Sequence, residues 1–336
     1  MALHKSRIEW CDYTWNPVTG CRHGCSYCYA RRIADRFKPQ ACERPEVNPL
    51  ECLPRGSGLY YLDVPAQVVD QDGRRLRGTP YPKGFEPTFH AYTLDFPQRL
   101  EKPSKIFVSS MGDLFGEWVP DGWIERTFEA AEKAPQHTYL FLTKNPSRYL
   151  EMALAKRLPE RENFWYGTTI VAPENPFFFA RGYKTFLSIE PMLEPFPRES
   201  ESGMNPFYMT SIGWVIIGAM TGPGSKHNQP ERQWIENIMD AAAAAGIPVF
   251  LKDSLRPIWG EELVQVYPVG MPGWIPGHKP IPKCRGCLAR VEVPQGKRGT
   301  AIRCTANPDE HGRPQAVGAR YARTSPPWCP RRKETE

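Results

Sequence analysis

Three cysteines stand close together near the start of the chain. Cys21, Cys25 and Cys28 are spaced C-x3-C-x2-C. This spacing can supply three thiolates to a four-iron cubane, which proteins normally hold with four cysteines. A three-cysteine site therefore leaves one iron open to a ligand from outside the protein.

Two other interpretations of this motif remain open. The cysteines could form part of a zinc site with His23 as the fourth ligand, or they could be buried apolar thiols. A zinc knuckle needs neither a strand before it nor a long α/β domain after it, so the iron–sulfur interpretation is favoured.

The motif resembles that of the radical S-adenosylmethionine (SAM) enzymes. There the open iron binds the amino and carboxylate groups of SAM, and reductive cleavage yields a 5′-deoxyadenosyl radical. Tyr27 stands where those enzymes usually carry an aromatic residue against the adenine. The resemblance implies a [4Fe–4S] cluster and SAM as cofactors, with an electron donor such as flavodoxin or ferredoxin.

The cysteines lie between a predicted strand and a predicted helix. Residues 8–16 alternate apolar and polar side chains, which is typical of a strand, and Pro17 and Gly20 then end it. Residues 29–37 carry apolar side chains at helical spacing. Barrel-type α/β enzymes place their sites on such strand-to-helix loops.

Short apolar runs between helical segments continue along the chain, and they predict a parallel sheet. We expect α/β architecture, with a partial or near-closed parallel (β/α) barrel of radical SAM type and a small C-terminal metal-binding module. The further predicted strands are 105–110, 139–143, 164–170, 184–191, 213–218 and 247–252, and the clearest helices are 120–134 and 231–245.

Most of these strands end in polar residues, which in parallel barrels face the ligand. Polar residues mark any strand end, but together and beside the cysteine loop they predict a pocket. Glu190 and Lys252 are predicted catalytic residues, because a charge closing an apolar strand is costly unless it is paired or functional. A structural ion pair is the alternative. The other residues expected to bind cofactor are Ser109, Ser110, Asp113, Thr143, Lys144, Thr168, Thr169, Ser188 and Gly218, together with Tyr27.

Several motifs in order resemble the phage Gp37/Gp68 family, also called DUF5131 or three-Cys-motif proteins, over roughly residues 5–255. They lie at 8–21, 28–30, 107–115, 142–146 and 187–193. By resemblance to radical SAM enzymes, Ser110 to Asp113 would approach the SAM amino group, and Thr168 and Thr169 the ribose. The chain departs from the family pattern at 218–222 and 252–255, which implies a substrate specific to this branch.

The predicted barrel core comprises residues 1–38 and 91–258, interrupted by an insertion at 39–90. Asp72-Gly73 in the insertion signals a hairpin turn. Cys42 and Cys52, also in the insertion, are interpreted as surface thiols rather than a further metal pair.

Residues 259–336 form a predicted basic extension. A C-x2-C pair and two later cysteines give this segment four ligands, the number in a structural zinc site. Bound zinc would help the segment to fold, because it is poor in large apolar residues. An auxiliary iron–sulfur cluster is the alternative, and His311 could replace a cysteine in either. Its positive side chains suit a phosphate backbone, although charge could serve solubility alone. The predicted metal ligands are Cys284, Cys287, Cys304 and Cys329.

Composition limits the class of protein. No apolar run reaches the roughly 20 residues of a membrane span, and the start of the chain lacks a signal-peptide core, so we expect a cytoplasmic protein without a membrane partner. Ten cysteines then indicate metal or redox chemistry rather than disulfides. The net charge of +6 permits a nucleic-acid partner.

The sequence thus predicts a radical SAM enzyme that abstracts hydrogen from a substrate, with nucleic acid or nucleotide modification or repair as the favoured chemistry. Radical SAM modification of a peptide or protein is one alternative. The other is a non-enzymatic, zinc-dependent nucleic-acid-binding protein.

Overall fold

A parallel sheet organises the chain. The computed structural model describes residues 4–41, 43–46, 57–196, 212–260 and 262–273, together with three strands between 290 and 316. The central sheet has eight strands in the order β1-β2-β9-β10-β11-β12-β13-β14. They are β1 His4–Lys5, β2 Tyr13–Trp15, β9 Lys105–Val108, β10 Thr138–Thr143, β11 Phe164–Ile170, β12 Lys184–Ile189, β13 Trp214–Ile217 and β14 Val249–Leu251.

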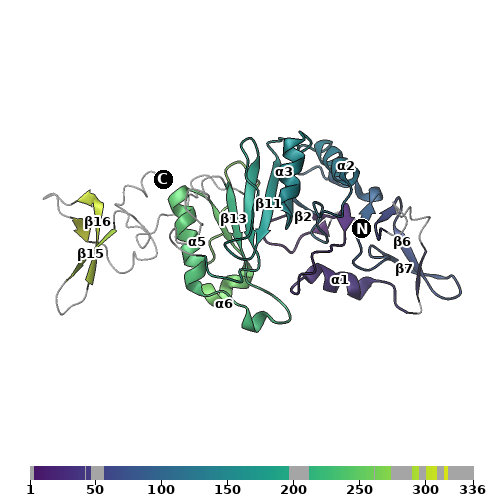
Figure 1. Ribbon diagram of the computed structural model, residues 1–336, viewed down its shortest axis with the longest axis horizontal. Coiled ribbons are helices and arrows are strands. Elements are labelled where there is room, and N and C mark those ends of the chain that lie inside the picture. Colours follow the sequence, from purple (N-terminus) through teal and green to yellow (C-terminus); the bar gives the residue numbers. More distant parts are fainter. Residues whose placement is uncertain are drawn as a thin grey trace.

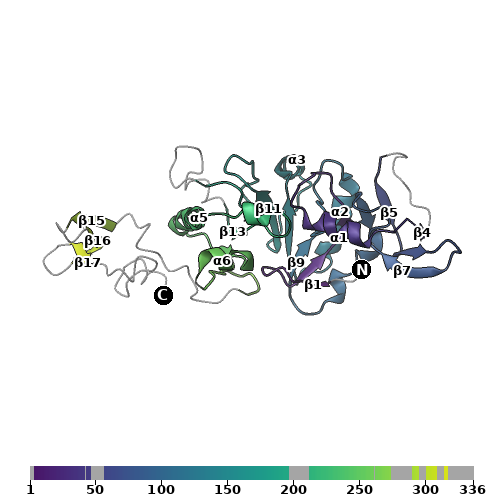
Figure 2. The ribbon, with the colours of Figure 1, turned by 90° about the horizontal axis from the view of Figure 1, so that it is seen from below.

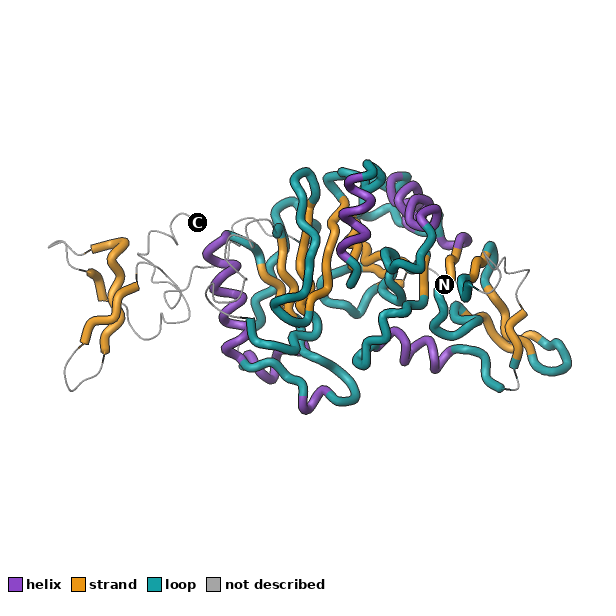
Figure 3. The backbone as a smooth tube through the Cα atoms, in the orientation of Figure 1, coloured by secondary structure: helices purple, strands orange, loops and turns teal. Residues whose placement is uncertain are grey.

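Seven of these strands, β2 and β9 to β14, run parallel, and β1 pairs antiparallel with β2. The sheet curls into a half-barrel, with helices on its outer side (Figures 1 and 3). The predicted partial (β/α) barrel is confirmed. The helices are α1 Tyr29–Phe37, α2 Asp121–Glu132, α3 Pro146–Leu154, α5 Arg232–Ala245 and α6 Arg256–Trp259, and the short 3-10 turns are η1 Ala91–Thr93, η2 Pro97–Arg99, η3 Ser225–His227 and η4 Asp253–Leu255.

Side chains alternate between the two faces of each strand, and both faces are buried, which explains the nearly continuous apolar runs. On β12, Phe186 points into the concave side, whereas Leu187 and Ile189 point outward under α5. The outer core under α2 and α3 is a separate aromatic cluster built from β9, β10 and β11. Because of this alternation, every second residue of a strand faces the interior of the half-barrel.

The predicted strand at 8–16 is shorter in the structure, where β2 covers only Tyr13–Trp15. A turn closes earlier, since the Cys11 amide donates to the Ile8 carbonyl (3.3 Å). This turn directs Trp10 into the concave core, with its ring centroid 4.7 Å from that of Phe107. Local alternation was therefore overridden by the burial of a large aromatic side chain.

Both edges of the sheet carry an antiparallel partner. β1 covers β2 at one edge. At the other edge the Leu251 amide donates to the Val264 carbonyl (2.7 Å), and Phe250 and Gln265 form an antiparallel bridge.

Small sheets surround the start of the barrel. β3 Val18–Thr19 joins β8 Thr88–His90 and β5 Tyr60–Leu62, and β4 Arg44–Glu46 joins the hairpin of β6 Ala66–Val69 and β7 Arg75–Thr79. The hairpin predicted at Asp72-Gly73 is confirmed, because Asp70 accepts from the Asp72 and Arg74 amides and Gly73 has φ +81°. Figure 2 shows β4, β5 and β7 of these sheets beyond the far end of α1.

The C-terminal segment contains an antiparallel sheet, β15 Arg290–Pro294, β16 Thr300–Pro308 and β17 Pro314–Ala316. Cys304 lies in β16 opposite Arg290. Cys284, Cys287, Cys329 and His311, like Cys42 and Cys52, lie outside the described residues, so the predicted C-terminal metal site and the domain boundaries stay predictions. No helix in the described part of the chain is long and apolar enough to cross a membrane.

A buried histidine below the cysteine loop gives a pH prediction. Burial lowers the pKa of His90 from 6.5 to about 3, and its Nε2 shares a hydrogen bond with Thr19 Oγ1 (2.9 Å). The unfolded chain therefore binds one more proton below pH 6.5, so stability is full above that pH and falls as the pH drops toward 3. Between about pH 7 and pH 5 the loss from this residue is about 2 kcal/mol.

Urea unfolding of the protein, prepared without added iron or sulfide, at both pH values checks this expectation. His90→Gln should reduce the pH dependence by that amount, whereas His227→Gln, on an exposed turn, should not. An unchanged pH dependence in His90→Gln would contradict the assignment.

Candidate active site

A cavity of about 420 Å³ opens where the parallel strands end. Segments far apart in the sequence contribute to its wall: the cysteine loop, the start of α1 and the ends of β9 to β14. The residues proposed from sequence that line it are Cys21, Cys25, Tyr27, Cys28, Ser110, Asp113, Thr143, Lys144, Thr169, Ser188, Glu190 and Lys252.

Backbone contacts hold the cysteine loop against the loop that follows β9. The Gly20 amide donates to the Met111 carbonyl (2.9 Å), and Gly20 forms a parallel bridge with Gly112. Gly20 has φ +87°, and a side chain there would collide with the Glu86 carbonyl. Glycine at this position therefore fixes where the first cysteine stands.

The three thiols are free and share the cavity wall. Cys28 caps α1, because its Sγ accepts from the Arg31 amide (3.4 Å). Burial raises the pKa of Cys21 to about 12, and the neighbouring charges of Asp113, Cys25 and Cys28 act in the same direction. A positively charged iron group bound here would relieve this cost, since a coordinating thiol is deprotonated.

The candidate metal ligands on this loop are three cysteine thiols and His23. Among the described residues, no group of three or more His, Cys, Asp or Glu side chains is arranged to hold one metal ion. His23, the candidate fourth zinc ligand, bonds through Nε2 to Asp113 Oδ2 (2.7 Å). With His23 held by Asp113, the three free thiols are the ligand set predicted for a cubane.

Asp113 connects three segments. It accepts hydrogen bonds from His23 on the cysteine loop (2.7 Å), from Thr143 Oγ1 at the end of β10 (2.8 Å) and from the Lys144 amide (3.0 Å). The Phe115 amide donates to Oδ1 (3.0 Å), the oxygen that also accepts from Thr143, whereas His23 and the Lys144 amide bond to Oδ2. Because protein donors occupy both oxygens, this carboxylate positions the cysteine loop.

Lys144 and Tyr27 form a second contact over the cavity. Lys144 Nζ donates to the Tyr27 hydroxyl (2.9 Å) and lies 5.2 Å from the centroid of its ring. Burial lowers the pKa of Lys144, although the thiol of Cys25 and the carboxylate of Asp113 oppose this. Burial, followed by the Cys25 charge, raises the pKa of Tyr27, so its ring stays neutral beside the cysteines.

Glu190 and Lys252 form an ion pair (2.8 Å), with Glu9 3.8 Å from the same ammonium. Burial lowers the pKa of Lys252, but Glu190 and Glu9 raise it by more, so the net shift is upward. Gly218 lies against this pair, since a Cβ there would be 3.1 Å from both side chains. Oε1 of Glu190 is buried and has no hydrogen-bond partner in the described part of the chain. Glu190 lines the cavity, and one of its two carboxylate oxygens has no hydrogen-bond donor among the described residues.

Three expected residues do not line the cavity. Thr168 points outward and accepts from the Phe178 amide (3.1 Å), because it alternates with Thr169, which faces the cavity. Ser109 is buried outside the cavity wall, and its backbone is in the left-handed region at φ +59°. Gly218 lies behind Glu190 and Lys252.

Other wall residues were not predicted from sequence. Glu9, Trp10, Tyr29, Phe107 and Ser254 all line the cavity. Glu9 and Trp10 fall within the motif at 8–21, and membership of that motif was the sequence signal that could have placed them at the site.

A comparison with models of protein families shows which family the chain belongs to. The family model described as "Protein of unknown function (DUF5131)" matches residues 5–271. The chain belongs to the DUF5131 family. The predicted DUF5131 membership is confirmed, whereas the phage Gp37/Gp68 name stays a prediction.

No curated protein matches this DUF5131 chain. A solved structure similar to it is a spore photoproduct lyase double mutant with bound AdoMet and dinucleoside spore photoproduct, at 10% identity and a TM-score of 0.36. That match covers 71% of this chain and 63% of the lyase. Spore photoproduct lyase complexed with dinucleoside spore photoproduct matches at 10% identity and a TM-score of 0.35, over 92% of this chain and 72% of that one.

Removing the acceptor at Asp113 should loosen the cysteine loop. In Asp113→Asn the charge-assisted hydrogen bonds, each about 1.5–3 kcal/mol, are lost or weakened. We expect the iron and sulfide retained after anaerobic reconstitution and gel filtration to fall at least about two-fold. Asp95→Asn, which removes an exposed carboxylate paired with Arg99, is the control. Equal iron content in Asp113→Asn and the wild type would show that Asp113 does not position the cysteine loop.

Breaking the ion pair at Lys252 should destabilise the fold. Lys252→Met leaves Glu190 and Glu9 without their cation and should lower the free energy of unfolding by about 2 kcal/mol, less than for fully buried pairs because both partners are about one-fifth exposed. Urea unfolding at neutral pH measures this. The double variant Glu190→Gln/Lys252→Met should recover part of the loss. No recovery would show that the paired charge is not the cause.

Proposed function

We propose that this DUF5131 protein is a radical SAM enzyme whose [4Fe–4S] cluster is held by Cys21, Cys25 and Cys28, and that its substrate is a nucleic acid or nucleotide. One observation carries the proposal. Three free thiols from one loop share a strand-end cavity, and the neighbouring candidate ligand, His23, is bonded to Asp113. In this proposal the fourth ligand comes from a molecule in the cavity.

When bound, a reduced cluster supplies the electron that cleaves SAM and makes a radical able to abstract hydrogen from an unreactive C–H bond. The protein must hold the reactants in place and keep other hydrogen donors away. Trp10, Phe107 and Leu142 give the cavity an apolar wall that favours the exclusion of water.

The polar side chains have separate tasks in this proposal. Asp113 fixes the cysteine loop relative to β9 and β10. Lys144 holds Tyr27 over the cavity, where its ring can lie against a flat ligand group. Glu190 lines the cavity, where its carboxylate can accept from an N–H or O–H donor of a ligand, while Lys252 keeps this carboxylate ionised and oriented.

The C-terminal extension has a proposed accessory role. Its cysteines would hold zinc or an auxiliary cluster, and its excess of arginine and lysine would attract a phosphate backbone. A cytoplasmic enzyme supplied with electrons by flavodoxin or ferredoxin would match this chemistry.

The test is anaerobic reconstitution of the full chain with iron and sulfide, followed by a reductant and SAM. We expect cluster absorbance and 5′-deoxyadenosine from the wild type, and loss of that product by about 100-fold or more in Cys25→Ala, because one of three thiolate ligands is gone. Cys11→Ala is the matched control, since Cys11 is a buried cysteine outside the cavity wall.

Two results would overturn the proposal. One is a wild type that assembles no cluster and makes no 5′-deoxyadenosine while holding zinc at the Cys21 loop. The other is equal product from wild type and Cys25→Ala, which would place the reaction outside the three-cysteine motif.

A further inference from the structure

Helix α1 exposes an apolar stripe. Ala30 and Ala34 are buried on one side of the helix, whereas Tyr29, Ile33 and Phe37 are 44%, 36% and 49% exposed. Their i, i+4, i+8 spacing aligns them along the helix. A helix of a folded domain usually buries such a stripe against the core, so its exposure points to a partner.

Two arginines border the stripe. At 100° per residue, Arg32 and Arg36 fall beside Tyr29 and Ile33 and away from the buried alanines. Neither arginine forms an ion pair with any residue that the structure describes. The acidic residue of this helix, Asp35, falls beyond Arg32 on the side away from the stripe, and it pairs with Lys38 (3.1 Å). The exposed face is therefore cationic as well as aromatic.

This face leads directly into the cavity. The Tyr29 hydroxyl donates to the Ser110 carbonyl (2.7 Å), and this exposed side chain forms part of the cavity wall. Arg32 lies against the loop after β13, since a Cβ on Gly222 would be 2.7 Å from Arg32 Nη2. Ala219 and Thr221 of that loop also line the cavity.

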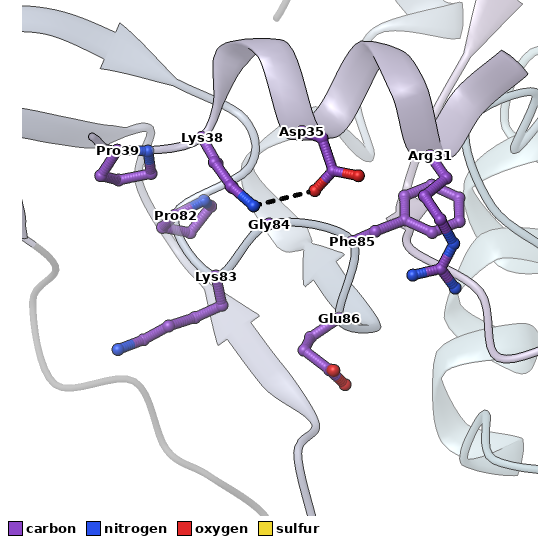
Figure 4. A pocket seen from close by; sticks show the side chains of 9 residues that line it. All are labelled: Arg31, Asp35, Lys38, Pro39, Pro82, Lys83, Gly84, Phe85 and Glu86. Atoms are coloured by element: carbon purple, nitrogen blue, oxygen red, sulfur yellow. Dashed lines mark hydrogen bonds and ion pairs between the residues drawn. The ribbon is translucent and has the colours of Figure 1, made fainter. Parts of the chain in front are cut away.

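The other flank of α1 is different. It borders a groove of about 340 Å³ whose lining includes Arg31, Lys38, Lys83, Asp35 and Glu86 (Figure 4). Lys38 is paired with Asp35, and Arg31 lies over the Phe85 ring, 4.9 Å from its centroid. Its positive and negative side chains nearly balance, so this groove has little preference for a polyanion.

We propose that the face formed by Tyr29, Arg32, Ile33, Arg36 and Phe37, here called the α1 face, binds single-stranded nucleic acid and directs it toward the cavity. Exposed aromatic rings stack with unpaired bases, and arginines between them contact phosphates. From residue 29 to residue 37 the helix rises about 12 Å, which spans a few nucleotides. A duplex hides its base faces and cannot use the rings in this way. The inference rests on the nucleic-acid substrate of the proposed function.

The test measures binding of a fluorescein-labelled single strand of about 12 nucleotides to the reconstituted full chain by anisotropy. Phe37→Ala should weaken binding about 10-fold through lost stacking. Arg32→Ala/Arg36→Ala should also weaken it, and should lower the slope of log K against log salt by about 1.4, as for two phosphate contacts on a single strand.

Matched controls lie on other faces. Leu154→Ala removes an apolar side chain that is 78% exposed on α3, and Lys133→Ala/Arg181→Ala removes two exposed charges. Both should bind the strand like the wild type, with the salt slope of the double control unchanged. Circular dichroism and thermal melting of every variant report whether the fold is kept.

Several outcomes would overturn the α1 face as a single-strand site. One is equal affinity of the α1-face variants and their controls for the single strand. Another is tighter binding of the matching duplex than of the single strand. The third is tighter binding of anionic lipid vesicles or of poly-glutamate than of the single strand, with the same sensitivity to Phe37→Ala. The proposed function is scored separately by 5′-deoxyadenosine from the wild type. Oligonucleotide binding without that product would overturn the enzyme proposal and support the α1 face, and the product with unaffected variants would overturn the α1 face alone.

Discussion

Asp113 gathers donors from segments that are 30 and 90 residues away in the sequence. Its hydrogen bonds to His23, Thr143 and the Lys144 amide bring the cysteine loop, β9 and β10 to one point. The loop could not be fixed by regular secondary structure, because nine residues separate β3 from α1. A buried carboxylate is stable only when its oxygens are satisfied, so its partners have little freedom to move. The position of the three thiols depends on this network.

Glu190 and Lys252 also join segments that are far apart in the sequence. This pair joins the ends of β12 and β14, and Glu9 links it to the segment before β2 by accepting from the Asp253 amide (3.0 Å). Charges thus connect the first and last parallel strands at the point where no hydrogen-bonded ladder joins them. Both networks line one cavity, together with apolar side chains of the concave core.

The sequence predicted the half-barrel, and most of its predicted site residues line the cavity, because strand periodicity and strand ends are local signals. It could not decide between Thr168 and Thr169, since which neighbour faces inward depends on the register of β11 with β12. It also placed a strand over residues 8–16, where the burial of Trp10 imposes a turn. Tyr29 was assigned to a helix by its spacing, but its exposure and its bond to Ser110 arise from tertiary packing.

The antiparallel partners at the two edges of the half-barrel have a consequence for association between molecules. An open sheet presents rows of unpaired amides and carbonyls, which invite strand addition and aggregation. Here β1 covers the β2 edge, and the segment around Val264 and Gln265 covers the β14 edge. The half-barrel can therefore remain open between β2 and β14 without offering its ladder to another chain. A closed barrel would hide its edges by joining them, whereas this sheet hides each edge with a separate segment.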